Sequence, residues 1–177
     1  MNSSTGRSAE SEKRTGFEQD LDHLRQVRLF QGLDLEHLKL IAMLSRKVDL
    51  IEGDQLMVQG EDDGNAYYLI TGKLQGFHRK SGIDYPMLVV EPGEFIGGLA
   101  LLGTAIRLFT VQATETSSLL RLPRDSFQKA MQQFTGNMAK IAANMASEVA
   151  DWEKNVLIQI EEKELEVGNQ SLGISLL

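Results

Sequence analysis

The spacing of apolar residues changes along the chain and divides it into parts. Over residues 17–44 apolar positions recur at helical spacing, first within 17–30 and then behind Asp34, which is placed to cap a second helix. Over residues 46–122 short apolar runs alternate with clusters of Gly, Asp, Asn and Pro. This texture is typical of about seven or eight strands in a sandwich or jelly-roll barrel. The first two thirds of the chain therefore predict helices followed by a β barrel.

Helical spacing returns after Pro123, which ends the last predicted strand. A short helix is expected from Arg124, with a break at Gly136, and a long helix beyond it. Apolar positions in the long helix repeat every 11 residues, which keeps a nearly straight stripe along one face. The stripe consists of Met138, Ile141, Met145, Val149, Trp152, Val156 and Ile160. It predicts a homodimer through paired helices over Met138–Ile160.

These elements predict an α+β fold that is mainly β, a jelly-roll β barrel flanked by N-terminal helices and a long C-terminal helix. The length of 177 residues suits one domain with an added helix. We expect a disordered polar tail over residues 1–16 and a domain with its N-terminal helices over 17–135. The long helix is expected over 136–166 and a frayed end over 167–177.

Composition excludes several classes of function. The net charge of −7 disfavours a nucleic-acid surface, and the absence of cysteine rules out disulfides and thiolate metal sites. No signal segment or run of about 18 apolar residues is found, so we expect a cytoplasmic protein without membrane contact. Asp62–Asn65 lacks the alternating ligands of a calcium loop and is expected to form a turn. Neither a metal site nor a cofactor is expected from the spacing of His23, His37 and His78.

The most informative segment spans residues 91–113. It contains a turn, the pair Gly97–Gly98, a short apolar helical turn and a single arginine, Arg107, before an apolar strand. Such an arginine favours a buried anion site, because guanidinium forms charge-assisted hydrogen bonds with phosphate. The alternative is a structural pair between Arg107 and a nearby acid such as Glu94 or Asp84.

The order of these elements resembles the cyclic nucleotide-binding domain of the superfamily that includes the catabolite activator protein and the regulatory subunit of protein kinase A. The resemblance extends over roughly residues 30–134. It rests on six motifs in order: Glu52-Gly-Asp54, Gly60-Glu-Asp-Asp63, Tyr67-Tyr-Leu-Ile-Thr-Gly72, Glu91-Pro-Gly-Glu-Phe95, Gly97-x-Leu-Ala-Leu-Leu102 and Arg107-x-x-Thr-Val111.

The resemblance implies that the segment matching Phe95–Val111 is the phosphate-binding cassette, in which backbone amides and Arg107 hold a cyclic phosphate. Its expected ligand contacts are Gly97, Gly98, Leu99, Ala100, Arg107, Leu108 and Phe109. Trp152 and Glu153 fall where the long helix of the family reaches the base, and the indole of Trp152 can stack on a purine. Alternatively, Trp152 packs in the apolar helix stripe.

Gly98 departs from the family pattern, which has at this position a glutamate that accepts a hydrogen bond from the ribose 2′-hydroxyl. A hydrogen bond to a charged group contributes roughly 1.5–3 kcal/mol. Its loss weakens binding about tenfold to hundredfold. The expected ligand is therefore a cyclic nucleotide such as cAMP or cGMP, weakly held, or a related phosphate-bearing molecule.

Two functions remain open on the sequence. The first is a non-enzymatic regulatory protein that senses this ligand and relays binding through the long helix to a protein partner; no nucleophile elbow or phosphate-binding P-loop is found. The second is a degenerate domain that binds no nucleotide and acts as a dimeric interaction scaffold, with Leu108 and Phe109 filling the cavity. No DNA binding is expected, because the 12 residues after Leu165 are too few for a winged helix-turn-helix.

Overall fold

The computed structural model describes residues 16–133, 136–151 and 154. Its described part contains eight strands in two antiparallel four-stranded sheets. In spatial order, the first sheet consists of β1 (Arg46–Leu50), β8 (Ser117–Pro123), β3 (Asn65–Thr71) and β6 (Phe95–Ile96). The second consists of β2 (Gln55–Met57), β7 (Thr110–Ala113), β4 (Leu74–Lys80) and β5 (Ile83–Val90). This arrangement confirms the predicted jelly roll and α+β class.

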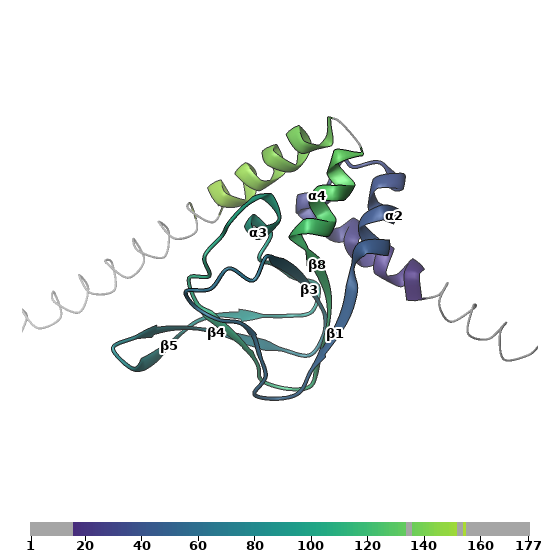
Figure 1. The fold of residues 1–177 in the computed structure, drawn as a ribbon. Helices are drawn as coiled ribbons and strands as arrows, with labels where there is room; N and C mark the ends of the chain where they lie inside the picture. Colours follow the sequence, from purple (N-terminus) through teal and green to yellow (C-terminus); the bar gives the residue numbers. More distant parts are fainter. Residues whose placement is uncertain (1–15, 134–135, 152–153, 155–177) are drawn as a thin grey trace, which may run out of the picture.

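Helical segments cover the outer face of the first sheet (Figure 1). They are a helix over 16–26, the 3₁₀ turn η1 (Arg28–Phe30), α2 (Leu35–Leu44), α4 (Arg124–Gln132) and a helix over 137–151. The short α3 (Leu99–Leu102) lies between β6 and β7 in the chain. Gly136, with a φ of 111°, precedes the last helix. The break predicted at Gly136 and the helix start predicted at Arg124 are both found.

The two central strands of the first sheet, β3 and β8, are buried on both faces, and the two-residue period of each strand divides its side chains between two cores. In β3, Tyr68 joins the core beneath the helices, whereas Tyr67 and Leu69 join the core between the sheets. In β8, Leu120 and Leu119 divide in the same way. Because both faces are covered, β3 reads in the sequence as an unbroken apolar run rather than as an alternating one.

Each of the five described helical segments that cover the first sheet contributes a fully buried side chain to the helical core. Leu24, Leu29, Ile41, Phe127 and Ile141 are each no more than 1% exposed. Burial of one such side chain stabilises the fold by roughly 1.5–3 kcal/mol. The helices before the barrel and those after it thus form one layer with a shared core.

Asp34 occupies the N-cap position of α2, as predicted, but its side chain makes no capping hydrogen bond. Its carboxylate lies instead 3.5 Å from Nδ1 of His37. The position was therefore predicted correctly, and the chemistry of the cap was not.

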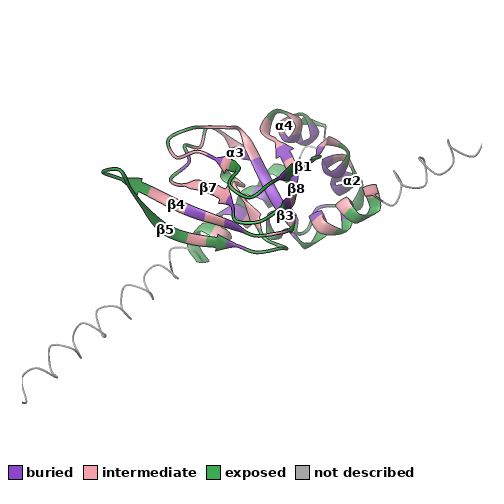
Figure 2. Ribbon diagram, turned by 90° about the horizontal axis from the view of Figure 1, so that it is seen from below, coloured by how far each residue is buried: buried purple, intermediate pink, exposed green. Residues whose placement is uncertain are grey.

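The β4–β5 hairpin extends away from the helical layer and is largely exposed (Figure 2). Pro86 and Asp84 interrupt the apolar pattern over the first half of β5. Proline is tolerated because β5 is an edge strand, where one N–H faces away from the sheet.

The helix over 137–151 packs on its own barrel. Ile141 and Met145 are buried in the helical core, whereas Met138 and Val149 are 42% and 36% exposed. Two residues of the apolar stripe that predicts a homodimer, Ile141 and Met145, thus pack in the core of this chain. Trp152, Val156 and Ile160 lie outside the described residues, and the homodimer stays a prediction.

Gly72 provides a test of how tightly the barrel closes. It has a φ of 92°, and a Cβ there would lie 2.6 Å from Cα of Ser117, whereas Gly82, with a φ of 80°, has no atom within 4 Å of the added Cβ. We expect Gly82→Ala to cost about 1–2 kcal/mol from backbone strain alone. Gly72→Ala should lose a further ~1–3 kcal/mol because the methyl group meets backbone.

Urea unfolding of the two variants measures this difference. Equal losses of unfolding free energy in Gly72→Ala and Gly82→Ala would show that the turn relaxes around the methyl group.

Candidate functional site

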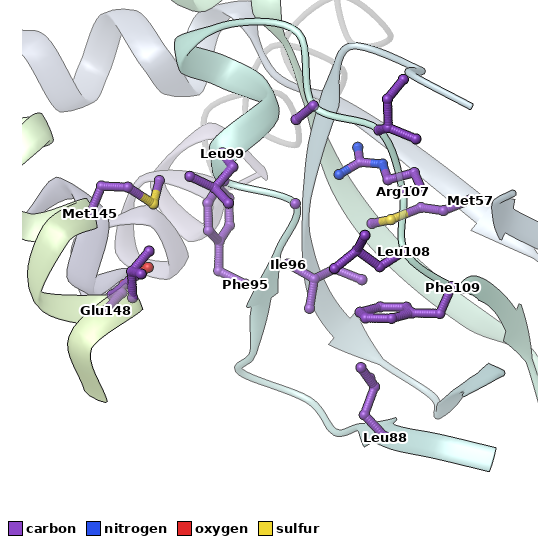
Figure 3. A pocket seen from close by; sticks show the side chains of 15 residues that line it. Met57, Leu88, Phe95, Ile96, Leu99, Arg107, Leu108, Phe109, Met145 and Glu148 are labelled. Carbon is purple, nitrogen blue, oxygen red and sulfur yellow. The ribbon is translucent and has the colours of Figure 1, made fainter. Parts of the chain in front are cut away.

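A cavity of about 420 Å³ lies between the cassette, the second sheet and the helix over 137–151. Its strand side carries Arg107 and Phe109, and its helix side carries Met145 and Glu148 (Figure 3). Apart from Arg107 and Glu148, the described residues that line it are apolar or glycine. The site therefore consists of one cation and one carboxylate in apolar surroundings.

Arg107 packs directly on the backbone of Gly97. A Cβ on Gly97 would lie 2.8 Å from Nη1 of Arg107 and 3.0 Å from the carbonyl oxygen of Asn65. Gly97 also has a φ of 80°, in the region that favours glycine. The first glycine of the cassette is thus required both by its conformation and by the arginine that lies against it.

The guanidinium of Arg107 is anchored by the turn before β3. Its Nη2 donates to the Asp63 carboxylate and to the Asn65 carbonyl oxygen. Asp63 also accepts hydrogen bonds from the hydroxyl of Tyr67 at 3.2 Å and from the amide of Asn65 at 3.0 Å. Burial, together with the Asp63 carboxylate, raises the pKa of Tyr67 to about 12. The arginine is therefore held in a buried polar network.

This network corrects the partner proposed for Arg107. Asp84 pairs instead with Arg79 at 2.6 Å, and the Glu94 carboxylate accepts a hydrogen bond from the amide of Glu91 at 2.7 Å. Both acids are closer to Arg107 in sequence than Asp63 is, but Asp84 belongs to β5 and Glu94 to the turn before β6. Proximity along the chain was the wrong criterion, because the turn before β3 is brought to the cassette by strand pairing.

A second pair lies beside the first. Arg124, at the start of α4, donates through Nη2 to the Asp62 carboxylate and through Nε to the carbonyl oxygen of Ala100. The hydrogen bond from Arg124 lowers the pKa of Asp62. Over Asp62–Asn65 no backbone hydrogen bond closes a β-turn; instead the side chain of Asp62 accepts a hydrogen bond from the amide of Gly64 at 3.2 Å, an Asx-type turn. Its two carboxylates have a role that the sequence reading missed, namely to bind two arginines.

Part of the Arg107 guanidinium is not satisfied within the described residues. The side chain is 8% exposed, and its buried Nε has no hydrogen-bond partner there. An unpaired buried donor costs roughly 1–3 kcal/mol. The arginine is thus a structural residue with one donor that no described residue uses.

Gly98 lies in contact with the last helix. A Cβ on Gly98 would lie 3.2 Å from Cε of Met145, 3.3 Å from Leu29 and 3.3 Å from Phe95. These distances are tight for a methyl group and leave no room for a longer side chain unless Met145 moves. The glutamate expected from the family is therefore replaced by an apolar contact between the cassette and the helix.

Polar contacts fix the same helix on the η1 turn. Nδ2 of Asn144 donates to the carbonyl oxygens of Leu29 at 3.0 Å and Gln31 at 2.9 Å. Arg28 pairs with Asp151 at 2.6 Å. Because Leu29 lies against Gly98 on one side and receives Asn144 on the other, it links the cassette to the helix.

Glu148 is the second charged residue of the cavity. Burial raises the pKa of its carboxyl group; Arg28 opposes this effect, and Asp151 adds to it. Within the described residues no group of three or more His, Asp or Glu side chains is placed to hold a metal ion. No helix in the same part of the chain is long and apolar enough to cross a membrane.

Most of the predicted cassette residues come together at the cavity. Gly97, Gly98, Leu99, Arg107, Leu108 and Phe109 line it. Ala100 does not line it but is fully buried, with its carbonyl oxygen bonded to Arg124. Trp152 and Glu153 lie outside the described residues. The sequence reading missed Met57, Leu88, Ile96 and Glu148, whose place at the cavity depends on strand order and helix docking.

Comparison with known proteins agrees with this geometry. The model of the cyclic nucleotide-binding domain family matches residues 47–134. A cyclic nucleotide-binding-like protein from Brucella abortus is 27% identical, with a TM-score of 0.60, over 64% of this chain and 98% of that one. The regulatory domain of Toxoplasma gondii PKA, solved with cAMP, is 30% identical, with a TM-score of 0.62, over 66% of this chain and 44% of that one.

Plant potassium channels are similar over a longer stretch. Potassium channel AKT1 of Oryza sativa is 27% identical over 159 residues, which is 87% of this chain and 17% of the channel. Potassium channel KOR1 of Oryza sativa is 24% identical over 82% of this chain and 18% of the channel. The chain thus spans less than a fifth of these channels. Through residues 47–134, the chain belongs to the cyclic nucleotide-binding domain superfamily.

Proposed function

We propose that this protein is a non-enzymatic regulatory module whose cassette binds a small anion, a cyclic nucleotide or a related phosphate-bearing molecule, and relays binding to the helix over 137–151. One observation carries the proposal: the cavity that contains Arg107 has the cassette as one wall and this helix as another. A ligand that contacts both walls favours one arrangement of the helix over others, which is a population shift.

Two further features support a binding role rather than catalysis. The cavity offers an arginine and a carboxylate but no Ser, Cys or His side chain among its described lining residues. Cyclic nucleotide-binding domains occur in regulatory proteins and in plant potassium channels, and the similar Toxoplasma domain was solved with cAMP. A sensor that acts through its partners fits these observations.

The anion site is tested by thermal shift with cAMP, cGMP, cyclic dinucleotides and 5′-AMP. A ligand at about 100 times its Kd should add ~2.7 kcal/mol to the stability. For a chain of this size, that raises Tm by roughly 5–10 °C at about 2–4 °C per kcal/mol. Arg107→Ala should remove the shift.

Arg124→Ala is the matched control for Arg107→Ala. It breaks the neighbouring arginine–aspartate pair on the same turn but does not line the cavity. Its ligand-induced shift should therefore persist on a lowered baseline Tm. Absence of any shift in the unmodified protein, or an equal shift in Arg107→Ala, would contradict the anion site.

The relay depends on the docking of the helix on η1. Asn144→Ala removes two hydrogen bonds to carbonyl oxygens, each worth about 0.5–1.5 kcal/mol. We expect amide hydrogen exchange in the helix over 137–151 to become roughly tenfold faster or more. Ser147→Ala, at an exposed position of the same helix, should leave exchange nearly unchanged. Equal protection in both variants would show that η1 does not hold the helix.

A dimeric interaction scaffold is the second candidate. Exposed apolar side chains favour it: Leu99, Ile106 and Leu108 at the cavity mouth are 54%, 56% and 69% exposed, and Met138 and Val149 are exposed on the helix. Leu108 and Phe109 line the cavity and leave it open, contrary to the expectation that they fill it. Light scattering at tens of micromolar should detect a homodimer formed by the helix Met138–Ile160, and a monomer would contradict it.

A further inference from the structure

The cavity has few groups that can recognise a nucleotide. A ribose and a base carry hydroxyl, amino and ring-nitrogen groups that need hydrogen-bond partners when they are buried. Among the described lining residues, only Arg107 and Glu148 have polar side chains. The position that would hold the ribose, Gly98, is covered by the tip of Met145. Within the described residues, a nucleotide bound here would find few side-chain partners for its polar groups.

The charges in the cavity favour a ligand with a single negative group. Asp63 already pairs with Arg107, and Glu148 places a carboxylate on the opposite wall (Figure 3). The cavity therefore has no excess of positive charge. One anionic group beside the Arg107 guanidinium is favourable, whereas a second negative charge near Glu148 would be repelled.

The remaining surface is suited to an apolar body. Met57, Leu88, Ile96 and Phe109 gather on the strand side beside Arg107 (Figure 3). Met57 and Leu88 belong to β2 and β5 of the second sheet, Ile96 belongs to β6, and Phe109 directly precedes β7. The volume of about 420 Å³ falls within the range of roughly 300–1,000 Å³ that small-molecule sites occupy. Methionines at 57 and 145 can adapt to chains of different shape.

We propose that the ligand of this site is an amphiphile with a single anionic group, a carboxylate or phosphate-ester head at Arg107, and an apolar body in place of the ribose and base. The proposal rests on the proposed function of the cassette as an anion site. It deepens that function by naming the class of ligand. Leu99 and Leu108, exposed at the mouth, would be covered by the apolar body.

Methionine-methyl NMR can test this proposal directly. The methyl groups of Met57 and Met145 line the cavity, whereas Met43 is 63% exposed on α2 and Met131 is buried in the helical core. The probes are decanoate, decyl phosphate, decanol and cAMP, all kept below micelle-forming concentrations. Decanoate or decyl phosphate should shift the signals of Met57 and Met145 and leave Met43 unchanged. The two charged probes separate a carboxylate head from a phosphate head.

Substitutions test separately where the anionic head and the apolar body of the ligand bind. Arg107→Ala should weaken decanoate or decyl phosphate by about tenfold to hundredfold, the loss expected for a hydrogen bond to a charged group. Arg124→Ala breaks the neighbouring pair between Arg124 and Asp62 and should leave the affinity for the amphiphile within about twofold of that of the unmodified protein. Because Arg107 also supports the fold, Leu108→Asp provides a second test at an exposed position. It should weaken binding at least tenfold, whereas Ile51→Asp, at a similarly exposed position away from the cavity, should not.

The outcomes separate this inference from the function on which it rests. Shifts with cAMP at lower concentration than with the amphiphiles, lost in Arg107→Ala, would overturn the amphiphile and leave the anion site intact. Equal affinity for decanol and decanoate would overturn the head contact at Arg107. No shift of Met57 or Met145 with any probe would overturn both the inference and the anion site.

Discussion

The ion pair between Arg107 and Asp63, in which the guanidinium lies against Gly97, is the contact on which the geometry of the cassette depends. A guanidinium in a protein interior must be paired, and here the pairing joins a turn before β3 to a segment more than 40 residues later in the chain. The approach requires glycine at position 97, because any Cβ would meet Nη1 of Arg107. The geometry of the cavity wall therefore follows from a charge that has to be neutralised.

The second pair, between Arg124 and Asp62, joins the same turn to the start of α4. Arg124 reaches both the turn and the carbonyl oxygen of Ala100, so the start of α4 is tied to the middle of α3. Two neighbouring acids thus hold a strand, the cassette and a helix together. The last helix completes the layer through Met145, which lies with Leu29 against Gly98 of the cassette.

The sequence predicted the parts of the molecule that local patterns control. The barrel, the break at Gly136, the helix start at Arg124 and the burial of Arg107 all follow from spacing, glycine and proline. The partner of Arg107 could not be predicted, because Asp63 reaches it through strand pairing. Met145 and Glu148 were likewise out of reach, since helical spacing shows which face is apolar but not what that face covers. The one available signal was the pair of adjacent acids at Asp62 and Asp63, which suits two arginines better than a simple turn.

β3 is shared by nearly every part of this architecture. Asn65, at its start, holds Arg107; Tyr67 faces the core between the sheets and bonds to Asp63; Tyr68 faces the helices and packs on the ring of His23 at 5.1 Å between ring centres. The shape of the cavity and the stability of the fold therefore both depend on this strand. Evolution can alter the lining of the cavity from β2, β5 or the last helix, but a change in β3 alters the whole domain at once.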